Sequence, residues 1–320
     1  MKTSLDIGSL HLKNRVLVAS GTFGYGTEAA AFTDVTGLGG IVTKSVSLEP
    51  RVGNPPSRIA ETASGMLNSI GLANVGVEAF LEQKMPPLRG LDTAIIANIA
   101  ASSVGEYLEV MKRMEDEPGI DAYEINVSCP NVKEGGLQFG TSSTATAEVV
   151  RMLRPHTRRP LIIKLTPNVT RISEFARVCQ EEGANAVSMI NTLVGMAINI
   201  YTRKPKLSTV TGGLSGPAIK PVALAKVFEA SQAVSIPVIG IGGISSWVDA
   251  VEFLLAGASA VQVGTMNFID PDAGVKIARG MEEYAKKAGL ESLDELVGAM
   301  VLPEGAAAPG IMKSPSKDHD

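Results

Sequence analysis

The sequence predicts a single (β/α)8 barrel, the TIM-barrel fold. Eight short apolar runs alternate with helical patterns along the 320 residues, and each run ends at or beside a Gly, Ser, Thr, Lys or Asn. Near-continuous Val, Ile and Ala content is typical of parallel strands buried on both faces. Strands that alternate with helices close into a parallel sheet through right-handed crossovers. Because barrel active sites lie at the C-terminal strand ends, the small and polar residues there mark the expected site.

The elements follow in order along the chain. Two short segments, Leu5–Ile7 and Leu10–Leu12, predict a β-hairpin ahead of the barrel. The eight barrel strands are predicted at Val16–Ser20, Gly40–Ser45, Ala94–Asn98, Ala122–Val127, Leu161–Leu165, Ala186–Asn191, Val238–Gly242 and Ala260–Gly264. Helical patterns between them include Val104–Glu117, Thr144–Leu153, Ile172–Glu182, Pro221–Ala233 and Ser246–Ala256.

Two connections are too long for simple loops. Residues 46–80 and 192–220 are rich in Pro, Gly, Asn and Ser, and both follow strand ends on the expected active face. Long loops inside a compact domain are usually functional. Residues 1–302 are therefore expected to form the catalytic barrel domain, and the small, Pro-rich segment 303–320 a flexible tail.

Bulk properties exclude several classes of protein. A net charge of −4 without a run of Lys or Arg argues against nucleic acid as the main partner. No apolar stretch approaches the ~20 residues that span a bilayer. The first residues lack the apolar region of a signal peptide. A cytoplasmic protein without a membrane partner is expected.

Cysteine and histidine usage argues against a metal centre in this chain. Cys129 and Cys179 are the only cysteines, too few for a four-thiolate iron–sulfur or zinc site. The three histidines are scattered outside any metal-binding spacing.

Lysines end two of the predicted strands. Lys164 ends the fifth and Lys44 the second, so both ammonium groups would reach the barrel mouth and could balance a negative charge. The alternative is an exposed lysine just past a strand. The flanking Ile163 and Leu165 favour a functional role for Lys164.

Glycines at the last two strand ends predict a phosphate site. Gly242 and Gly243 follow the seventh strand, and Gly264 and Thr265 the eighth, where barrel enzymes bind phosphate through bare backbone N–H groups. Turns also need glycine, so the pairs alone are weak signals. Neither segment has the GxGxxG pattern of a dinucleotide site.

Asparagines and a cysteine complete the candidate site. Asn68, Asn98, Asn126, Asn131 and Asn191 lie at strand ends or in loops, and amides offer both donors and acceptors to a planar ligand. A single Asn at a turn would mean little.

Cys129 lies in a polar loop after the fourth strand and can be a general base or a nucleophile. Without a histidine nearby in sequence, a base is favoured. Cys179, on a helical pattern, is expected in the core.

Six motifs together resemble one enzyme family. They are NVSCPN (126–131), NSIGLAN (68–74), IIKLTP (162–167), INTLVGMAIN (190–199), TGGLSGPAIKP (211–221) and IGIGGI (239–244). Over essentially all of residues 1–300 the chain resembles class 1 dihydroorotate dehydrogenase. The segment 191–221 is most similar to the catalytic subunit of the NAD-linked subclass 1B, rather than to the fumarate-linked 1A enzymes. Cysteine at 129 also separates it from the membrane-bound class 2 enzymes, which have serine there.

The resemblance implies a flavoprotein oxidoreductase of pyrimidine biosynthesis. FMN would lie at the barrel mouth with dihydroorotate stacked on its ring; Cys129 would take the proton from C5 while hydride passes from C6 to flavin N5, and Lys44 would face the substrate carboxylate. The implied substrate residues are Lys44, Asn68, Ser69, Ile70, Gly71, Leu72, Asn126, Asn191 and Thr192. The implied FMN residues are Ser20, Lys44, Ser45, Asn98, Asn126, Lys164, Ile190, Gly216, Gly242, Gly243, Gly264 and Thr265.

The resemblance also implies a partner. Electrons would pass to NAD through FAD and a [2Fe–2S] cluster, and two cysteines cannot supply that cluster here. A second polypeptide is therefore expected, in a heterotetramer built on a homodimer of this chain. The alternatives are a fumarate-linked or dihydropyrimidine-reducing relative, a flavin-bearing scaffold, or a barrel aldolase with a Schiff base on Lys164.

Overall fold

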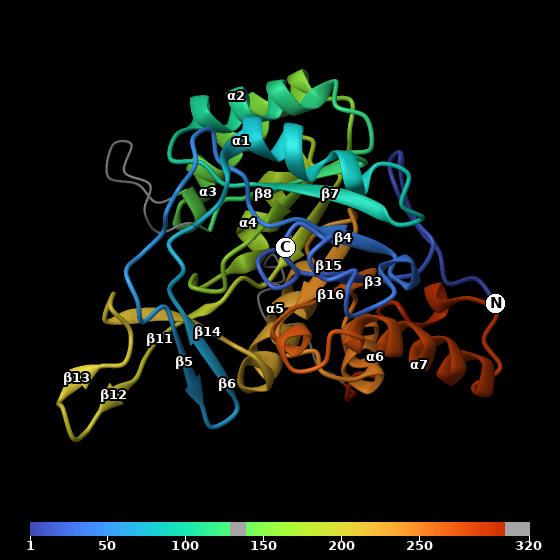
Figure 1. Ribbon diagram of the computed structural model, residues 1–320. Coiled ribbons are helices and arrows are strands. Elements are labelled where there is room, and N and C mark those ends of the chain that lie inside the picture. The colour runs from blue at the N-terminus through green and yellow to red at the C-terminus, as the bar shows by residue number, and fades with distance from the viewer. Residues whose placement is uncertain (129–138, 305–320) are drawn as a thin grey trace, which may run out of the picture.

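The computed structural model describes residues 1–128 and 139–304. Within these residues eight parallel strands close into a barrel, which confirms the predicted fold (Figure 1). The strands are β3 (Val16–Val18), β4 (Gly40–Val42), β7 (Ala94–Ile99), β8 (Ala122–Asn126), β9 (Leu161–Lys164), β10 (Ala186–Met189), β15 (Val238–Ile241) and β16 (Ala260–Val263). Their order around the barrel is β3-β4-β7-β8-β9-β10-β15-β16.

The predicted hairpin is also present. Strands β1 (Leu5–Ile7) and β2 (Leu10–Leu12) pair antiparallel. Their buried side chains form one cluster with apolar residues of the barrel strands, among them Leu17, Ile96 and Ile162. Residues two positions further along several of these strands are polar and also buried, as the pairs Ile96–Asn98 and Ile162–Lys164 illustrate. The barrel is thus filled in layers, apolar beside the hairpin and polar toward the C-terminal strand ends.

Helices cover the outside of the barrel (Figure 1). They are α1 (Gly76–Ala79), α2 (Val104–Glu115), α3 (Ser143–Leu153), α4 (Ile172–Glu181), α5 (Lys220–Ser231), α6 (Trp247–Leu255) and α7 (Ala273–Lys287), and the π-helix η2 (Phe80–Lys84) continues α1. Short 3-10 helices include η6 (Pro217–Ile219) and η7 (Thr265–Phe268), which follow Gly216 and Gly264. Ser103 and Ser246 cap α2 and α6 by accepting a backbone N–H in the first turn.

The two long connections contain strands that the sequence did not predict. Strands β5 (Ile59–Thr62), β6 (Gly65–Asn68), β11 (Leu193–Met196) and β14 (Thr211–Ser215) form an antiparallel sheet in the order β11-β14-β6-β5. The hairpin β12 (Ile198–Asn199) and β13 (Lys204–Pro205) extends beyond it (Figure 1). These strands are short and mostly half-exposed, so they lack the continuous apolar run of a barrel strand.

The C-terminal end of the chain is only partly described, and the helices were compared with the requirements of a membrane span. The predicted tail, 303–320, lies outside the described residues from position 305 onward. Within the described ranges, no helix combines the length and apolar character that crossing a membrane requires.

Candidate active site

A cavity of about 680 Å³ opens at the C-terminal ends of the barrel strands, beside the four-stranded sheet. This volume falls in the range of ~300–1,000 Å³ typical of small-molecule sites. The predicted residues that line it are Ser20, Lys44, Ser45, Asn68, Ser69, Ile70, Gly71, Leu72, Asn126, Lys164, Ile190, Asn191, Thr192, Gly216, Gly242, Gly243, Gly264 and Thr265. Asn98 is not among the lining residues. Cys129 and Asn131 lie outside the described residues.

Lys44 follows β4 and is half-buried at the cavity wall. Within residues 1–128 and 139–304, no acceptor lies in hydrogen-bond range of its ammonium group. Burial, reinforced by the positive charge of Arg58, lowers the pKa of Lys44. A cation held in this way, without a partner among the described residues, favours an anionic ligand.

Glu124, on β8, forms the centre of the floor beneath the cavity. Its side chain is fully buried. Oε1 accepts a hydrogen bond from Asn98 Nδ2 at 2.7 Å and lies 3.5 Å from Lys164 Nζ. Oε2 accepts from Ser188 Oγ at 2.8 Å and from Gln262 Nε2 at 2.7 Å. The floor therefore joins five strands of the barrel through one carboxylate.

Asn98 connects this floor to the cavity wall. Its Oδ1 accepts a hydrogen bond from Ser45 Oγ at 2.6 Å, while its amide nitrogen donates to Glu124. Because Asn98 is fully buried, its side chain positions the lining residue Ser45 rather than facing the cavity.

Two amides meet at the ends of β8 and β10. Asn191 Nδ2 lies 3.3 Å from Asn126 Oδ1, and Asn126 pairs with Lys164 in the register of β8 and β9. Asn191 Oδ1 also accepts the backbone N–H of Thr192 at 2.8 Å, which fixes its orientation. Asn126, Asn191 and Lys164 thus present polar groups to one part of the cavity.

Glycines that line the same cavity leave backbone groups accessible. Gly216, Gly242 and Gly243 have φ values of 94°, 127° and 73°, a region that L side chains rarely adopt. A Cβ on Gly243 would lie 2.8 Å from the backbone nitrogen of Lys220. Within the described part of the chain, no hydrogen bond involves the N–H of Gly243 or Ile244, so both are free to donate to a ligand.

The N–H groups that follow them are already satisfied. Asp249 accepts from the N–H groups of Ser245 and Ser246, each at 2.9 Å. Burial would raise the pKa of Asp249, but donors from Lys220, Ser245 and Ser246 outweigh it and hold the pKa at about 2. The N-terminus of α6 is therefore occupied, and the free donors for an anion are those of the glycine turn.

The segment Asn68–Leu72 forms another wall of the cavity. Asn68 Nδ2 donates to the carbonyl of Gly213 at 3.3 Å, across the β6–β14 pair. Asn54 donates to the carbonyl of Ser69 at 3.0 Å. The Ser69 hydroxyl is buried and has no hydrogen-bond partner within the described residues. It is therefore available to a ligand.

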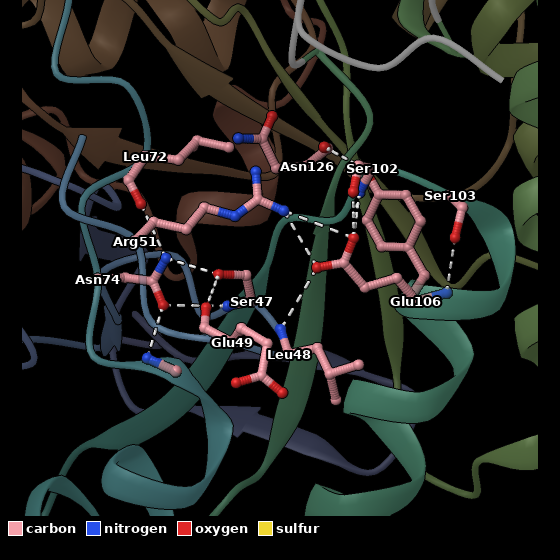
Figure 2. A network of polar contacts seen from close by, with 12 residues as sticks. Ser47, Leu48, Glu49, Arg51, Leu72, Asn74, Ser102, Ser103, Glu106 and Asn126 are labelled. Atoms are coloured by element: carbon pink, nitrogen blue, oxygen red, sulfur yellow. Dashed lines mark hydrogen bonds and ion pairs between the residues drawn. The ribbon is translucent and has the colours of Figure 1, made fainter. Parts of the chain in front are cut away.

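Leu72 has a φ of 56°, and Asn74 holds it in place (Figure 2). Asn74 Nδ2 donates to the Leu72 carbonyl at 2.8 Å and to Ser47 Oγ at 2.7 Å. Asn74 Oδ1 accepts from the N–H groups of Ser47 and Gly76, at 3.2 Å and 2.8 Å. One side chain thus ties the end of the Asn68–Leu72 segment to the chain after β4.

Helix α2 is joined to the same region (Figure 2). Glu106 accepts from Arg51 at 3.1 Å and from the backbone N–H of Ser102 at 2.6 Å. Its neighbour Tyr107 donates its hydroxyl to the carbonyl of Asn126 at 2.7 Å. The start of α2 thereby links the inserted segment to a strand end in the cavity.

Sequence reasoning missed two of these residues. Glu124 lies inside the strand Ala122–Asn126, and a charged side chain in a doubly buried strand was the available signal. Asn74 stands in the motif NSIGLAN without an assigned role, and its contacts with Ser47 depend on the fold.

The fold and the cavity together are those of a barrel enzyme with a small-molecule site at the C-terminal strand ends. The comparisons then give the family. The chain matches the family model for dihydroorotate dehydrogenase over residues 3–284. It therefore belongs to the dihydroorotate dehydrogenase family, as the motifs predicted.

Named relatives agree with this assignment. The chain is 51% identical over 298 residues to dihydroorotate dehydrogenase B (NAD(+)), catalytic subunit, of Geotalea uraniireducens, which covers 93% of this chain and 98% of the relative. It is 50% identical over 297 residues to the protein of the same name from Bacteroides thetaiotaomicron, with the same coverage. A crystal structure of the Eimeria tenella enzyme with ferulenol has a TM-score of 0.79 at 20% identity, covering 93% and 88% of the two chains, and supports the fold alone.

Proposed function

We propose that this chain is the FMN-binding catalytic subunit of an NAD-linked dihydroorotate dehydrogenase, which oxidises (S)-dihydroorotate to orotate in pyrimidine biosynthesis. One observation carries the proposal: Lys44 and three amides, Asn68, Asn126 and Asn191, line the same cavity as a glycine turn. Among the described residues, neither the Lys44 ammonium nor the N–H groups of that turn have a hydrogen-bond partner. Relatives about half identical over nearly their whole length support it.

The residues present fit FMN. The turn at Gly242–Gly243 has no room for a Cβ and offers bare N–H donors to the ribityl phosphate. Thr265 Oγ1 donates to Ser215 Oγ at 2.8 Å, and both residues line the cavity. Lys164, which lines the same cavity, would lie beside the pyrimidine edge of the flavin ring. When bound, FMN would accept the hydride that leaves C6 of the substrate.

The chain's own groups would bind and orient the substrate. Lys44 would pair with the carboxylate of dihydroorotate, and Asn68, Asn126 and Asn191 would hydrogen-bond its amide and imide edges. Cys129, outside the described residues, would take the proton from C5 as general base. Loss of that proton and of a hydride from C6 converts the C5–C6 single bond to the double bond of orotate.

The electrons would then leave through a partner. We place FAD and a [2Fe–2S] cluster on a second polypeptide, in a heterotetramer built on a homodimer of this chain in the cytoplasm. The relatives' description as catalytic subunits supports a partner, and the chain has only two cysteines.

Purification of the chain alone, and with its co-expressed partner, tests the proposal. The chain alone should carry FMN and reduce artificial dyes with dihydroorotate, but should not reduce NAD. Co-expression should restore NAD reduction. Reduction of fumarate by the single chain would instead favour the 1A-type reaction, and a colourless protein that forms a borohydride-trapped adduct on Lys164 would favour an aldolase.

A further inference from the structure

We propose that Glu124 is a positioning residue for the oxidation reaction: its carboxylate fixes the Lys164 ammonium from below and offsets its charge, which lowers the reduction potential of bound FMN. This inference rests on the proposed function, because it concerns the flavin beside Lys164. It adds a buried residue that contacts neither the cavity nor a ligand.

Hydrogen-bond donors surround the Glu124 carboxyl group. Four donors converge on its two oxygens: Asn98 Nδ2 and Lys164 Nζ at Oε1, and Ser188 Oγ and Gln262 Nε2 at Oε2. An ionised carboxylate accepts at both oxygens and suits this arrangement, whereas a protonated acid would direct its own O–H at one of the donors. The side chain is fully buried, so solvent does not screen its charge.

Lys164 stands between this carboxylate and the cavity. Its side chain is only 7% exposed, and Nζ lies 3.5 Å from Glu124 Oε1. Within the described residues, Glu124 is the one carboxylate paired with this ammonium. Since Lys164 also lines the cavity, its remaining N–H donors can face a ligand while Glu124 holds the group from the other side.

The charges have a predictable effect on the flavin. A positive charge near the flavin ring favours its reduced, electron-rich form, and a compensating negative charge opposes this. Loss of either member would leave the other buried and uncompensated. Removing the Glu124 charge should therefore raise the potential, and removing the Lys164 charge should lower it.

The test measures the reduction potential of bound FMN by spectroscopic titration against reference dyes. Glu124→Gln should increase the preference for reduced over oxidised FMN about tenfold, which corresponds to about 30 mV for a two-electron couple. Lys164→Gln should shift the potential in the opposite direction. The double variant, in which both charges are gone, should lie between the two single variants.

The double variant also keeps the test decisive if Glu124→Gln alone does not fold, because two amides can hydrogen-bond each other. Its potential must then lie above that of Lys164→Gln. A double variant equal to Lys164→Gln would overturn the inference.

Ser188→Ala is the matched control. It removes a hydrogen bond to Glu124 Oε2 but leaves the charge and the Lys164 contact, so the potential should not change. A shift as large as that of Glu124→Gln would assign the effect to packing and reject the proposal.

Bleaching of wild-type FMN by dihydroorotate separates this inference from the function on which it rests. If dihydroorotate reduces the wild-type flavin but the potentials do not move as stated, only the role of Glu124 fails. A wild-type chain without FMN would overturn both.

Discussion

The cavity has two parts that are built in different ways. Its floor, near the strand ends, consists of buried side chains that bond to one another, with Glu124 in contact with four polar groups. Its inserted walls, in residues 46–80 and 192–220, are half-exposed and are tied by asparagine side chains to backbone groups, as Asn54 and Asn74 show.

The difference suggests a division of labour. A rigid, charge-balanced floor suits a cofactor that stays bound through many turnovers. Half-exposed walls suit a substrate that enters and leaves, since loops open at lower free energy than core strands do. Changes in the floor should therefore alter flavin properties, and changes in the walls should alter substrate affinity.

The largest expected effect is on turnover, from loss of the general base, and involves neither the floor nor the walls. Cys129→Ala should lower turnover ~100- to 10,000-fold, the usual contribution of a general base. FMN content and orotate affinity should remain near wild type, because the floor and walls stay intact. Stopped-flow reduction of the flavin by dihydroorotate measures this.

Cys179→Ala provides the matched control for Cys129→Ala. Burial raises the pKa of the Cys179 thiol, which lies on α4, faces the protein core and stays protonated. The control should lose stability but keep its reduction rate per bound flavin. Near-normal turnover in Cys129→Ala would remove that residue from the mechanism.

Lys44 lies just after β4 rather than in an inserted wall, and it tests substrate binding directly. Lys44→Ala should weaken orotate binding about 10- to 150-fold, because a hydrogen bond to a charged group contributes roughly 1.5–3 kcal/mol. Lys44→Arg should lose less, since the charge remains. Lys13→Ala is the control. Lys13 precedes the first barrel strand and pairs with Asp92, away from the cavity lining, so this variant should bind orotate normally.

The lowered pKa of Lys44 predicts that orotate binding depends on pH. Since burial and Arg58 lower the pKa of Lys44, its ammonium loses its proton below the usual pH range of lysine. Orotate affinity should fall as the pH rises through this lowered pKa. The Lys44→Arg variant stays charged and corrects for ionisation of orotate itself. Parallel pH profiles for wild type and Lys44→Arg would contradict the assignment.

The two parts were not equally predictable from the sequence. Barrel strands are buried on both faces, so their apolar runs stand out, and lysines and glycines at their ends mark the mouth of the barrel. The strands β6 and β14 are short and glycine-containing, and the Asn68–Gly213 contact joins residues 145 positions apart. No local pattern reports such a pairing.

Within the site, the position of a residue along a strand could be predicted from the sequence, but its hydrogen-bond or ion-pair partner could not. Lys164 could be placed at the barrel mouth from its position at a strand end. Its partner Glu124 could not be paired with it, because the hydrogen-bonded register of β8 and β9 brings them together. Asn98 has the predicted strand-end position, yet its side chain turns to the floor.

A substitution at Gly243 tests whether the glycine turn binds the phosphate of FMN. Gly243→Ala should lower FMN affinity about tenfold, because the new Cβ would lie 2.8 Å from the Lys220 nitrogen and 2.9 Å from the Gly216 carbonyl. Gly289→Ala is a close control: its φ is 74° against 73° at Gly243, but its Cβ would meet nothing within 4 Å. Both variants should lose ~1–2 kcal/mol of stability from the backbone conformation. Equal loss of FMN in both would mean that the turn does not hold the phosphate.

Asn74 should give the smallest effect, and it tests whether the wall positions substrate at all. Asn74→Ala removes the tether on Leu72 and the one oxygen that accepts from two backbone N–H groups, at a cost of ~1–3 kcal/mol in stability. KM should rise several-fold while kcat stays close to wild type, the pattern expected when binding is lost equally in ground and transition states. Asn14→Ala, which loses contacts to Gly37 and Val16 at the opposite end of the barrel, should be destabilised without a change in KM. If instead the Asn74 variant lost kcat and kept its KM, the wall would act on the chemical step, and the separation of a cofactor floor from a substrate wall would have to be abandoned.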